Sequence, residues 1–268
     1  MKEVKTRILT QEEFLILQQE ERTILREIHR ICRKYEIPYY IVGGTLLGAV
    51  RHGGFIPWDD DIDIAMYRAD YDKFKAACAK ELGDSFFLQD IYSDPGYNQL
   101  MPKIRKNGTI LEYPHTLGLD MHKGVFVDVF MLDYVNKPSK MVEIKHDVYW
   151  FFLNLFMRKQ CHNIKSVIKR SIVSLIPAKL IVKFSGFIVS GKKNATYTVN
   201  YASMYGVKKQ TFPSDYYGAG TEIQFDDLTV MAPCKYIEIL TKIYGNYMEL
   251  PPIEKRGIHH RVCKLEVK

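Results

Sequence analysis

The chain has 268 residues, a formal net charge of +7 and a sequence pI of about 9.0, and 47% of its residues are hydrophobic. This composition predicts a globular protein with a substantial core and excludes a disordered or fibrous chain. A basic surface suits anionic partners. No basic run has the aromatic spacing of a nucleic-acid module, so we expect no nucleic-acid partner.

The cysteines and the apolar runs bear on the cellular compartment. The five cysteines are scattered and form no Cys-x-x-Cys pair, so reduced thiols are expected rather than disulfides or a zinc site. The charged N-terminus lacks the apolar core of a signal peptide. The longest uncharged apolar run, residues 148–157, is too short to cross a bilayer, which needs about 20 residues. We therefore expect a cytoplasmic protein.

The first predicted element is an amphipathic helix. Thr10 and Glu13 have the spacing of a capping box. Apolar residues then recur at helical spacing from Phe14 to about Tyr35, and Pro38 ends the pattern. We expect the apolar stripe of this helix to pack on the sheet that carries the active site.

The next stretch, residues 39–66, is the most informative one. A short apolar strand leads into a glycine turn and a short helix, which Gly53 ends as a left-handed cap. The acidic run that follows alternates with isoleucine, so Asp61 and Asp63 are expected to share one face of a strand. Two carboxylates about 7 Å apart repel each other unless a cation lies between them. Their oxygen atoms suit Mg²⁺ or Mn²⁺.

An acidic run of this kind is often only a solvated turn. Here it lies inside an alternating apolar pattern, and a glycine pair at the start of a helix precedes it. The N-terminus of a helix binds phosphate through its free N–H groups. Arg51 lies between the two features. Together they indicate chemistry on a phosphate ester.

Further along, residues 67–82 predict a second amphipathic helix and residues 86–91 a strand. Residues 100–111 predict a hairpin around an Asn-Gly turn, with Lys103 and Arg105 on one face. That face is either solvent-exposed, as is usual for such residues, or a phosphate-binding face.

A buried strand over residues 125–131 carries the single acid Asp128. A buried carboxylate is costly, so either a metal ion or a basic partner is needed beside it. Asp133, a little further on, is interpreted as a turn residue and not as a catalytic one.

The character of the chain changes at about residue 139, where helical segments mix apolar and basic residues as far as about residue 190. One interpretation is a helical cap that packs on the core. The other is an interfacial helix on anionic lipid. A further helix is predicted over residues 192–204, then a hairpin around Asp226 and Asp227, and a last helix that begins at Pro233.

The stretch GGTLLGAVRHGGFIPWDDDIDIAM resembles the signature of the LicD family, which includes fukutin-like proteins and lies in the nucleotidyltransferase-fold superfamily. The superfamily pattern is Gly-Gly, then acid–apolar–acid, then a third acid on a later strand. The resemblance extends to the Lys103–Arg105 segment and to residues 244–256.

The resemblance implies an α+β fold with a nucleotidyltransferase-like mixed sheet, flanking helices and a helical insertion. We expect residues 1–135 to form the catalytic core, residues 136–206 a basic and apolar cap, and residues 207–268 a segment that completes the core. The implied activity is the Mg²⁺- or Mn²⁺-dependent transfer of a phosphoalcohol, most typically phosphocholine from CDP-choline, onto a sugar hydroxyl, with release of CMP.

The implied partners are a CDP-alcohol donor and a glycan or lipid-linked glycan acceptor such as teichoic acid, lipopolysaccharide or capsule. Peripheral contact with the inner face of the membrane would involve residues 139–193. The head group stays open among choline, ribitol, glycerol and ethanolamine. A choline site needs aromatic faces or a carboxylate, for which the candidates are Trp58, Tyr92, Tyr97 and Tyr113.

The resemblance also implies the site residues. The catalytic and metal-binding acids are Asp61, Asp63 and Asp128. The substrate-binding residues are Gly43, Gly44, Thr45, Arg51, Lys103, Arg105 and His260, although the histidine has a surface tail as its alternative.

Three other functions compete with this one. A metal-dependent glycosyltransferase also uses an acid–apolar–acid motif and would bind a nucleotide sugar. A nucleotidyltransferase would use a nucleoside triphosphate and release pyrophosphate. A non-catalytic peripheral membrane protein would use the basic helices alone, and the intact set of three acids argues against it.

Overall fold

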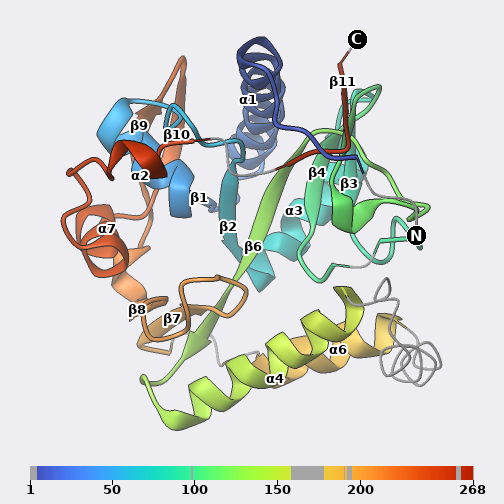
Figure 1. The fold of residues 1–268 in the computed structure, drawn as a ribbon. Coiled ribbons are helices and arrows are strands. Elements are labelled where there is room, and N and C mark those ends of the chain that lie inside the picture. The colour runs from blue at the N-terminus through green and yellow to red at the C-terminus, as the bar shows by residue number, and fades with distance from the viewer. Residues whose placement is uncertain are drawn as a thin grey trace.

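Seven strands form a mixed sheet at the centre of the protein (Figure 1). The computed structural model describes residues 5–97, 99–157, 178–189, 191, 195–257 and 261–267. In spatial order, the strands are β1 (Tyr40–Ile41), β2 (Asp63–Tyr67), β6 (Phe126–Val135), β4 (Lys103–Lys106) and β3 (Phe86–Gln89), with β7 (Tyr197–Asn200) on β6 and β8 (Thr211–Pro213) on β7. Only β2 and β6 pair in parallel; the other pairs within this described sheet are antiparallel. The predicted α+β class with a mixed sheet is therefore confirmed.

Helices and two small sheets surround the central sheet. The helices are α1 (Gln11–Lys34), α2 (Gly43–His52), α3 (Arg68–Glu81), α4 (Lys140–Met157), α6 (Ala178–Val189) and α7 (Tyr236–Tyr244). Short 3₁₀ turns cover Pro114–Thr116, Ser214–Tyr216 and Ile253–Lys255. The small sheets pair β9 (Thr221–Phe225) with β10 (Leu228–Ala232), and β5 (Ile110–Glu112) with β11 (Lys264–Glu266). Helices α1 and α3 pack on each other and on the central strands.

Helix α1 begins and ends where its sequence predicts. Thr10 accepts a hydrogen bond from the Glu13 N–H at 3.2 Å, and the Glu13 carboxylate accepts one from the Thr10 N–H at 2.9 Å. This is the predicted capping box. The helix ends at Lys34, and its apolar stripe is buried in the main core. One acid, Glu21, lies among these buried residues.

Helix α2 contains the glycine pair of the predicted signature, and strand β2 begins at the end of its acidic run. Helix α2 begins at Gly43 and ends at a left-handed Gly53 with φ of 74°, as predicted. The acidic run is only partly a strand, because β2 begins at Asp63. Ile62 and Ile64 are completely buried on the inner side, which confirms the predicted alternation.

Four local predictions were wrong. Asp133 was interpreted as a turn residue, but it lies within β6 and accepts two hydrogen bonds from Arg68. The turn at Gly108 exists, with φ of 76°, but β4 pairs with β3 and β6 while β5 pairs with β11, so the two strands form no hairpin. The helix predicted over residues 192–204 is replaced by strand β7, whose β-branched and aromatic residues favour a strand. The last helix begins at Tyr236 and not at Pro233.

Helices α4 and α6 pack on each other at one end of the molecule (Figure 1). Val142, Tyr149 and Val189 form a second core with residues of β7 and the following loop. The predicted helical segment between the two helices lies outside the described residues, as does His260. Strand β7 falls within the predicted cap segment yet belongs to the central sheet. In the part of the chain that the structure describes, no helix is both long and apolar enough to cross a membrane.

Candidate active site

The strand register places three chemically active residues side by side. Asp63 at the start of β2 is the register partner of Asp128 on β6, and Asp128 is the partner of Lys103 on β4. Neighbouring strands lie about 4.8 Å apart, and paired residues point to the same face of a sheet. The sheet therefore brings two of the three predicted acids together with Lys103, one of the predicted substrate-binding residues.

Asp63 lies within a group of negative charges. Its pKa is well above the ordinary value, first because burial disfavours the ionised form and then because Asp61, Asp128 and Asp59 repel it, with Lys103 opposing them. Asp61 lies two residues earlier, just outside the strand. Asp61 and Asp128 thus both act on Asp63 electrostatically.

Lys103 provides the basic partner that the buried strand needs. Its ammonium group donates to the Asp128 carboxylate and lies 3.6 Å from the centroid of the Phe126 ring. Lys103 is 4% exposed, and this burial lowers its pKa, while Asp128 opposes the change. The pair keeps a cation directly beside the acids, where a negatively charged substrate could exchange with the carboxylate.

Arg105 shares the face of Lys103, as predicted, but it lies deeper in the protein. Its guanidinium donates to the Gln89 side chain and to the Gly124 carbonyl, and it lies 4.8 Å from the Phe126 ring centroid. It is 2% exposed. This position supports the strand under Lys103, and direct contact of Arg105 with substrate stays a prediction.

The glycine pair lies against the acids. A Cβ atom on Gly43 would be 3.2 Å from Asp63 Oδ2, and one on Gly44 would be 2.4 Å from Asp59 Oδ2. Gly43 also has a positive φ of 58°, which glycine tolerates better than other residues. The Thr45 hydroxyl accepts a hydrogen bond from the Asp63 N–H at 2.8 Å. The first turn of α2 is therefore fixed against the start of β2.

Arg51 is on the last turn of α2 and holds the segment before the C-terminus. Its guanidinium donates to the carbonyl groups of Tyr247 at 3.0 Å and Glu249 at 3.4 Å. Burial lowers its pKa, while Tyr244 and Asp59 raise it and Arg256 lowers it. Arg51 therefore lies near Asp59 and near Arg256, and we call the two arginines the basic rim of the site.

Aromatic side chains line the same region. Trp58 carries the Arg256 guanidinium over its ring at 5.8 Å from the centroid. Burial raises the pKa of Tyr205 and of Tyr244, and the carboxylates of Asp59 and Asp63 add to the rise for both. The Tyr205 and Tyr244 rings meet edge to face with centroids 5.2 Å apart. Tyr205 and Tyr244 come from the second half of the chain, so the first-half motif alone does not reveal them.

The four aromatic candidates for a choline site separate in the structure. Burial raises the pKa of the Tyr113 hydroxyl, and Asp60, Glu21 and Asp61 add to the rise, so this residue is near the acids. Tyr97 is buried and donates to the Met101 carbonyl. Tyr92 is half exposed, and the Lys75 ammonium lies over its ring. Trp58 and Tyr113 are thus the two candidates nearest the acidic run.

Glu21 is a further acid near the site, and the motif does not contain it. It is 1% exposed, and its Oε2 atom has no hydrogen-bond partner among the described residues. Burial raises its pKa well above the ordinary value, and Asp61 and then Asp60 raise it further. The signal in the sequence is an acid on the apolar stripe of α1, four residues after the buried Leu17.

The acids suit a divalent cation by their chemistry and their charge. Carboxylate oxygens are the ligands that Mg²⁺ and Mn²⁺ prefer, and the mutual repulsion around Asp63 is what such a cation would relieve. In their present conformation, no three His, Cys, Asp or Glu side chains of the described residues are grouped closely enough to hold a metal. Mg²⁺ is usually held by only one or two protein carboxylates, with waters and substrate phosphates as its other ligands. Asp61 and Asp63 would hold it in that way, and Asp128 would join them on release from Lys103.

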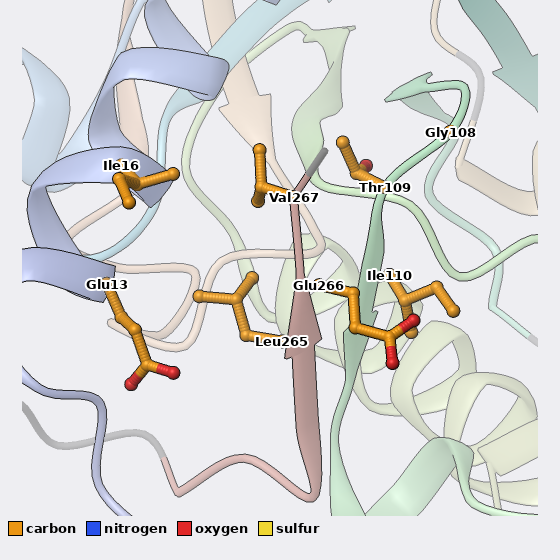
Figure 2. Close-up of a pocket in the computed structure, with 8 residues that line it drawn as sticks. All are labelled: Glu13, Ile16, Gly108, Thr109, Ile110, Leu265, Glu266 and Val267. Atoms are coloured by element: carbon orange, nitrogen blue, oxygen red, sulfur yellow. The ribbon is translucent and has the colours of Figure 1, made fainter.

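A separate pocket of about 840 Å³ lies between α1 and the small sheet of β5 and β11 (Figure 2). Its walls come from both the helix and the two strands, and they contain none of the predicted site residues. The lining residues are Glu13, Ile16, Gly108, Thr109, Ile110, Leu265, Glu266 and Val267. We do not assign the chemistry to this pocket, because it has no basic side chain for a phosphate.

Comparison with known proteins agrees with this geometry. Residues 36–164 match the family described as LicD/FKTN/FKRP, nucleotidyltransferase domain. The chain is 29% identical over 249 residues to the lipopolysaccharide cholinephosphotransferase LicD of Haemophilus influenzae, which covers 88% of this chain and 92% of that protein.

Two shorter similarities fall on limited stretches. A stretch of 71 residues is 41% identical to an uncharacterised protein of Rickettsia typhi and covers 26% of this chain and 23% of that protein. A stretch of 49 residues is 43% identical to the ribitol 5-phosphate transferase FKRP of Homo sapiens and covers 18% of this chain and 10% of that protein. The family match contains the glycine pair and all three predicted acids, and the similarity to LicD extends along most of the chain, so residues 36–164 of this chain are a domain of the LicD kind.

Proposed function

We propose that this enzyme transfers a phosphoalcohol from a CDP-alcohol to a hydroxyl group of a cell-surface glycan, with phosphocholine as the first candidate for the transferred group. The observation that carries the proposal is the similarity to a lipopolysaccharide cholinephosphotransferase over 88% of the chain. The adjacent register positions of Asp63, Asp128 and Lys103 support it, because they place two carboxylates and an ammonium group side by side on the sheet.

The residues of this chain have distinct parts in the proposed reaction. A Mg²⁺ ion held by Asp61, Asp63 and Asp128 would offset the charge of the donor diphosphate. Lys103 lies next to Asp128 and is positioned to take a phosphoryl oxygen as partner when the carboxylate turns away. Arg51 and Arg256 would orient the departing nucleotide phosphate from the rim, since phosphoryl transfer depends mostly on positioning and electrostatics.

The carboxylate of Asp128 is the candidate base for the acceptor hydroxyl. It accepts from the Lys103 ammonium and lies on the central strand, where the sheet fixes its position. A general base must be within hydrogen-bond reach of the proton that it removes. The acceptor hydroxyl would therefore approach the β6 side of the acids.

Two observations bear on the transferred alcohol. A choline ammonium cannot donate hydrogen bonds and is recognised by aromatic faces. The Arg256 guanidinium already lies over the Trp58 ring, so this ring face binds a cation, and a choline ammonium would take the place of the arginine there. The similarity to FKRP keeps ribitol phosphate as the second candidate, but it covers only 18% of this chain.

The proposal is tested by thermal unfolding of the full chain with CDP-choline, CDP-ribitol, CDP-glycerol, UDP-glucose or ATP, each with and without Mg²⁺. A ligand at a hundredfold excess over its dissociation constant stabilises the native state by about 2.7 kcal/mol. We expect a Mg²⁺-dependent shift with CDP-choline, and a loss of that shift in Asp63→Asn. A shift with CDP-ribitol instead would identify ribitol phosphate as the transferred group.

Stabilisation by UDP-glucose or ATP alone would overturn the proposal in favour of a glycosyltransferase or a nucleotidyltransferase. Trp58→Phe and Trp58→Ala separate the choline site from the phosphate site. Phenylalanine keeps an aromatic face, so it should retain most of the CDP-choline shift, whereas alanine should lose it and still bind CMP.

A further inference from the structure

Helices α4 and α6 expose large apolar side chains on their outer side. Phe151 is 61% exposed and Phe187 is 78% exposed. The full set of exposed apolar residues on these helices, among those whose side chains the structure describes, is Met141, Ile144, Phe151, Leu180 and Phe187. Single exposed apolar side chains are common, but several gathered on one surface mark a contact site for a protein or a membrane.

The inner sides of the same helices are already packed. Val142 and Tyr149 of α4 and Val189 of α6 form the second core with β7 and its loop. The exposed residues of α4 recur at positions 141, 144 and 151, which is the spacing of one helix face. Leu180 and Phe187 of α6 lie seven residues apart and so share a face as well. The helices thus have two apolar faces, and the core covers only one.

Basic residues accompany the exposed face. Lys140 and Lys145 lie on either side of the α4 stripe in helical projection, and Lys183 lies on the exposed face of α6. Described residues of α4 include two acids, Glu143 and Asp147, while α6 has none. An apolar stripe between lysines is the pattern of an interfacial helix, because the lysine chains reach the head groups while the apolar side chains insert.

The charge of the whole sequence is concentrated in this part of the chain. Residues 137–193 contain 12 Lys and Arg residues against two acids, whereas the rest contains 26 against 29. The protein is therefore basic because of this segment, and the remainder is slightly acidic. On the described part of this face, Lys140, Lys145 and Lys183 outnumber the exposed Asp147, so two copies that met through it would bring like charges together, whereas an anionic lipid surface would neutralise them.

We propose that the outer side of α4 and α6 rests on an anionic lipid surface and holds the enzyme there as a peripheral protein. The proposal combines the two exposed phenylalanines with the lysines that flank them. Neither helix is long and apolar enough to cross the bilayer, so contact at the interface is the form of binding that the described helices allow. This inference concerns binding alone and is independent of which phosphoalcohol is transferred.

The test is flotation of the full-length protein with vesicles of phosphatidylcholine, with or without about 30% phosphatidylglycerol, at low and high salt. We expect flotation with the anionic vesicles, little with the neutral ones, and weakening by salt because surface charges are screened. The variant with Phe151→Ser and Phe187→Ser should bind at least about tenfold more weakly. Ile237→Ser on α7, which is 53% exposed, is the matched control and should float like the native protein.

The charge is tested separately with Lys140→Gln and Lys183→Gln, for which Lys80→Gln on α3 is the control. The variant with both lysine substitutions should bind anionic vesicles more weakly and with less salt dependence, while the control should bind as the native protein does. Absence of flotation with anionic vesicles at low salt would overturn the proposal, and so would equal flotation with neutral vesicles. Unchanged flotation of the phenylalanine variant would also overturn it. A dimer that the phenylalanine variant abolishes would assign the face to a second copy of this chain.

Discussion

Two carboxylates on the central sheet show how the same residue type serves opposite purposes. Asp63 begins β2 among other acids, while Asp133 lies near the end of β6 and is 3% exposed. Burial raises the pKa of both side chains. What differs is the neighbours: negative charges raise the pKa of Asp63 further, whereas Arg68 lowers that of Asp133.

The difference has a geometric basis. Arg68 donates to Asp133 through both Nε, at 2.5 Å, and Nη2, at 2.8 Å, so the planar guanidinium binds the carboxylate in bidentate fashion. This pair is a complete structural unit that joins the start of α3 to β6. Asp63 instead lies among other carboxylates, and a bound cation would reduce the repulsion between them. The comparison therefore assigns a functional role to the Asp63 end of the sheet and a structural role to the Asp133 end.

The largest expected effect is that of Asp63→Asn on turnover. We expect activity to fall on the order of a thousandfold, because positioned charge contributes most of the catalysis of phosphoryl transfer. The folded protein should be as stable as the native one or more stable at pH 7, because an acid with a raised folded pKa destabilises the fold once it is ionised. Steady-state assays and urea unfolding measure the two quantities. Full Mg²⁺-dependent activity in this variant would contradict the assignment.

Asp133→Asn should give the opposite result and is the matched control. Burial also raises the pKa of Asp133, but here the carboxylate stabilises a cation, because Asp133 raises the pKa of Arg68. The variant leaves the Arg68 guanidinium without its carboxylate, and the arginine side chain is only 31% exposed. We expect a loss of roughly 2–3 kcal/mol in the free energy of unfolding, at the lower end for a broken buried pair because Arg68 keeps some solvent. Activity per folded molecule should be unchanged. A double variant that adds Arg68→Ala should lose less than the sum of the single changes, and strict additivity would show that the two groups do not interact.

Much of the site could be predicted because its parts are local. The capping box, the glycine pair, Gly53 as the end of α2 and the buried Ile62 and Ile64 are all read within a few residues of sequence. The structure bears them out, since hydrogen bonding and alternation at short range need no knowledge of distant strands.

What failed depended on contacts between distant segments. The Asn107–Gly108 turn is correct locally, but the flanking strands find better partners in β3, β6 and β11. The pairing of Lys103 with Asp128 follows from strand order, which periodicity does not specify. Arg105 was placed on the correct face, yet that face is covered in the fold, so the arginine lies in the interior.

The smallest expected effect belongs to Glu21→Gln, and it tests whether the acidic region extends into α1. Burial raises the folded pKa of Glu21 above the ordinary value for a glutamate, so its stabilising contribution is complete below about pH 4.5 and is lost as pH rises through the folded pKa. Glutamine stays neutral, so the variant should gain stability over the native protein as pH increases, by about 1–2 kcal/mol at pH 7. Urea unfolding between pH 4 and pH 8 measures this difference.

Glu12→Gln, at an exposed position of the same helix, is the control and should show no such gain. Mg²⁺ sharpens the experiment, because a cation among Asp61, Asp63 and Asp128 would reduce the negative potential at Glu21. The native protein should then gain more stability from Mg²⁺ than Glu21→Gln does. A stability difference between native protein and variant that is the same at every pH would show that Glu21 does not sense the acids, and α1 would then serve the site only as a packing surface.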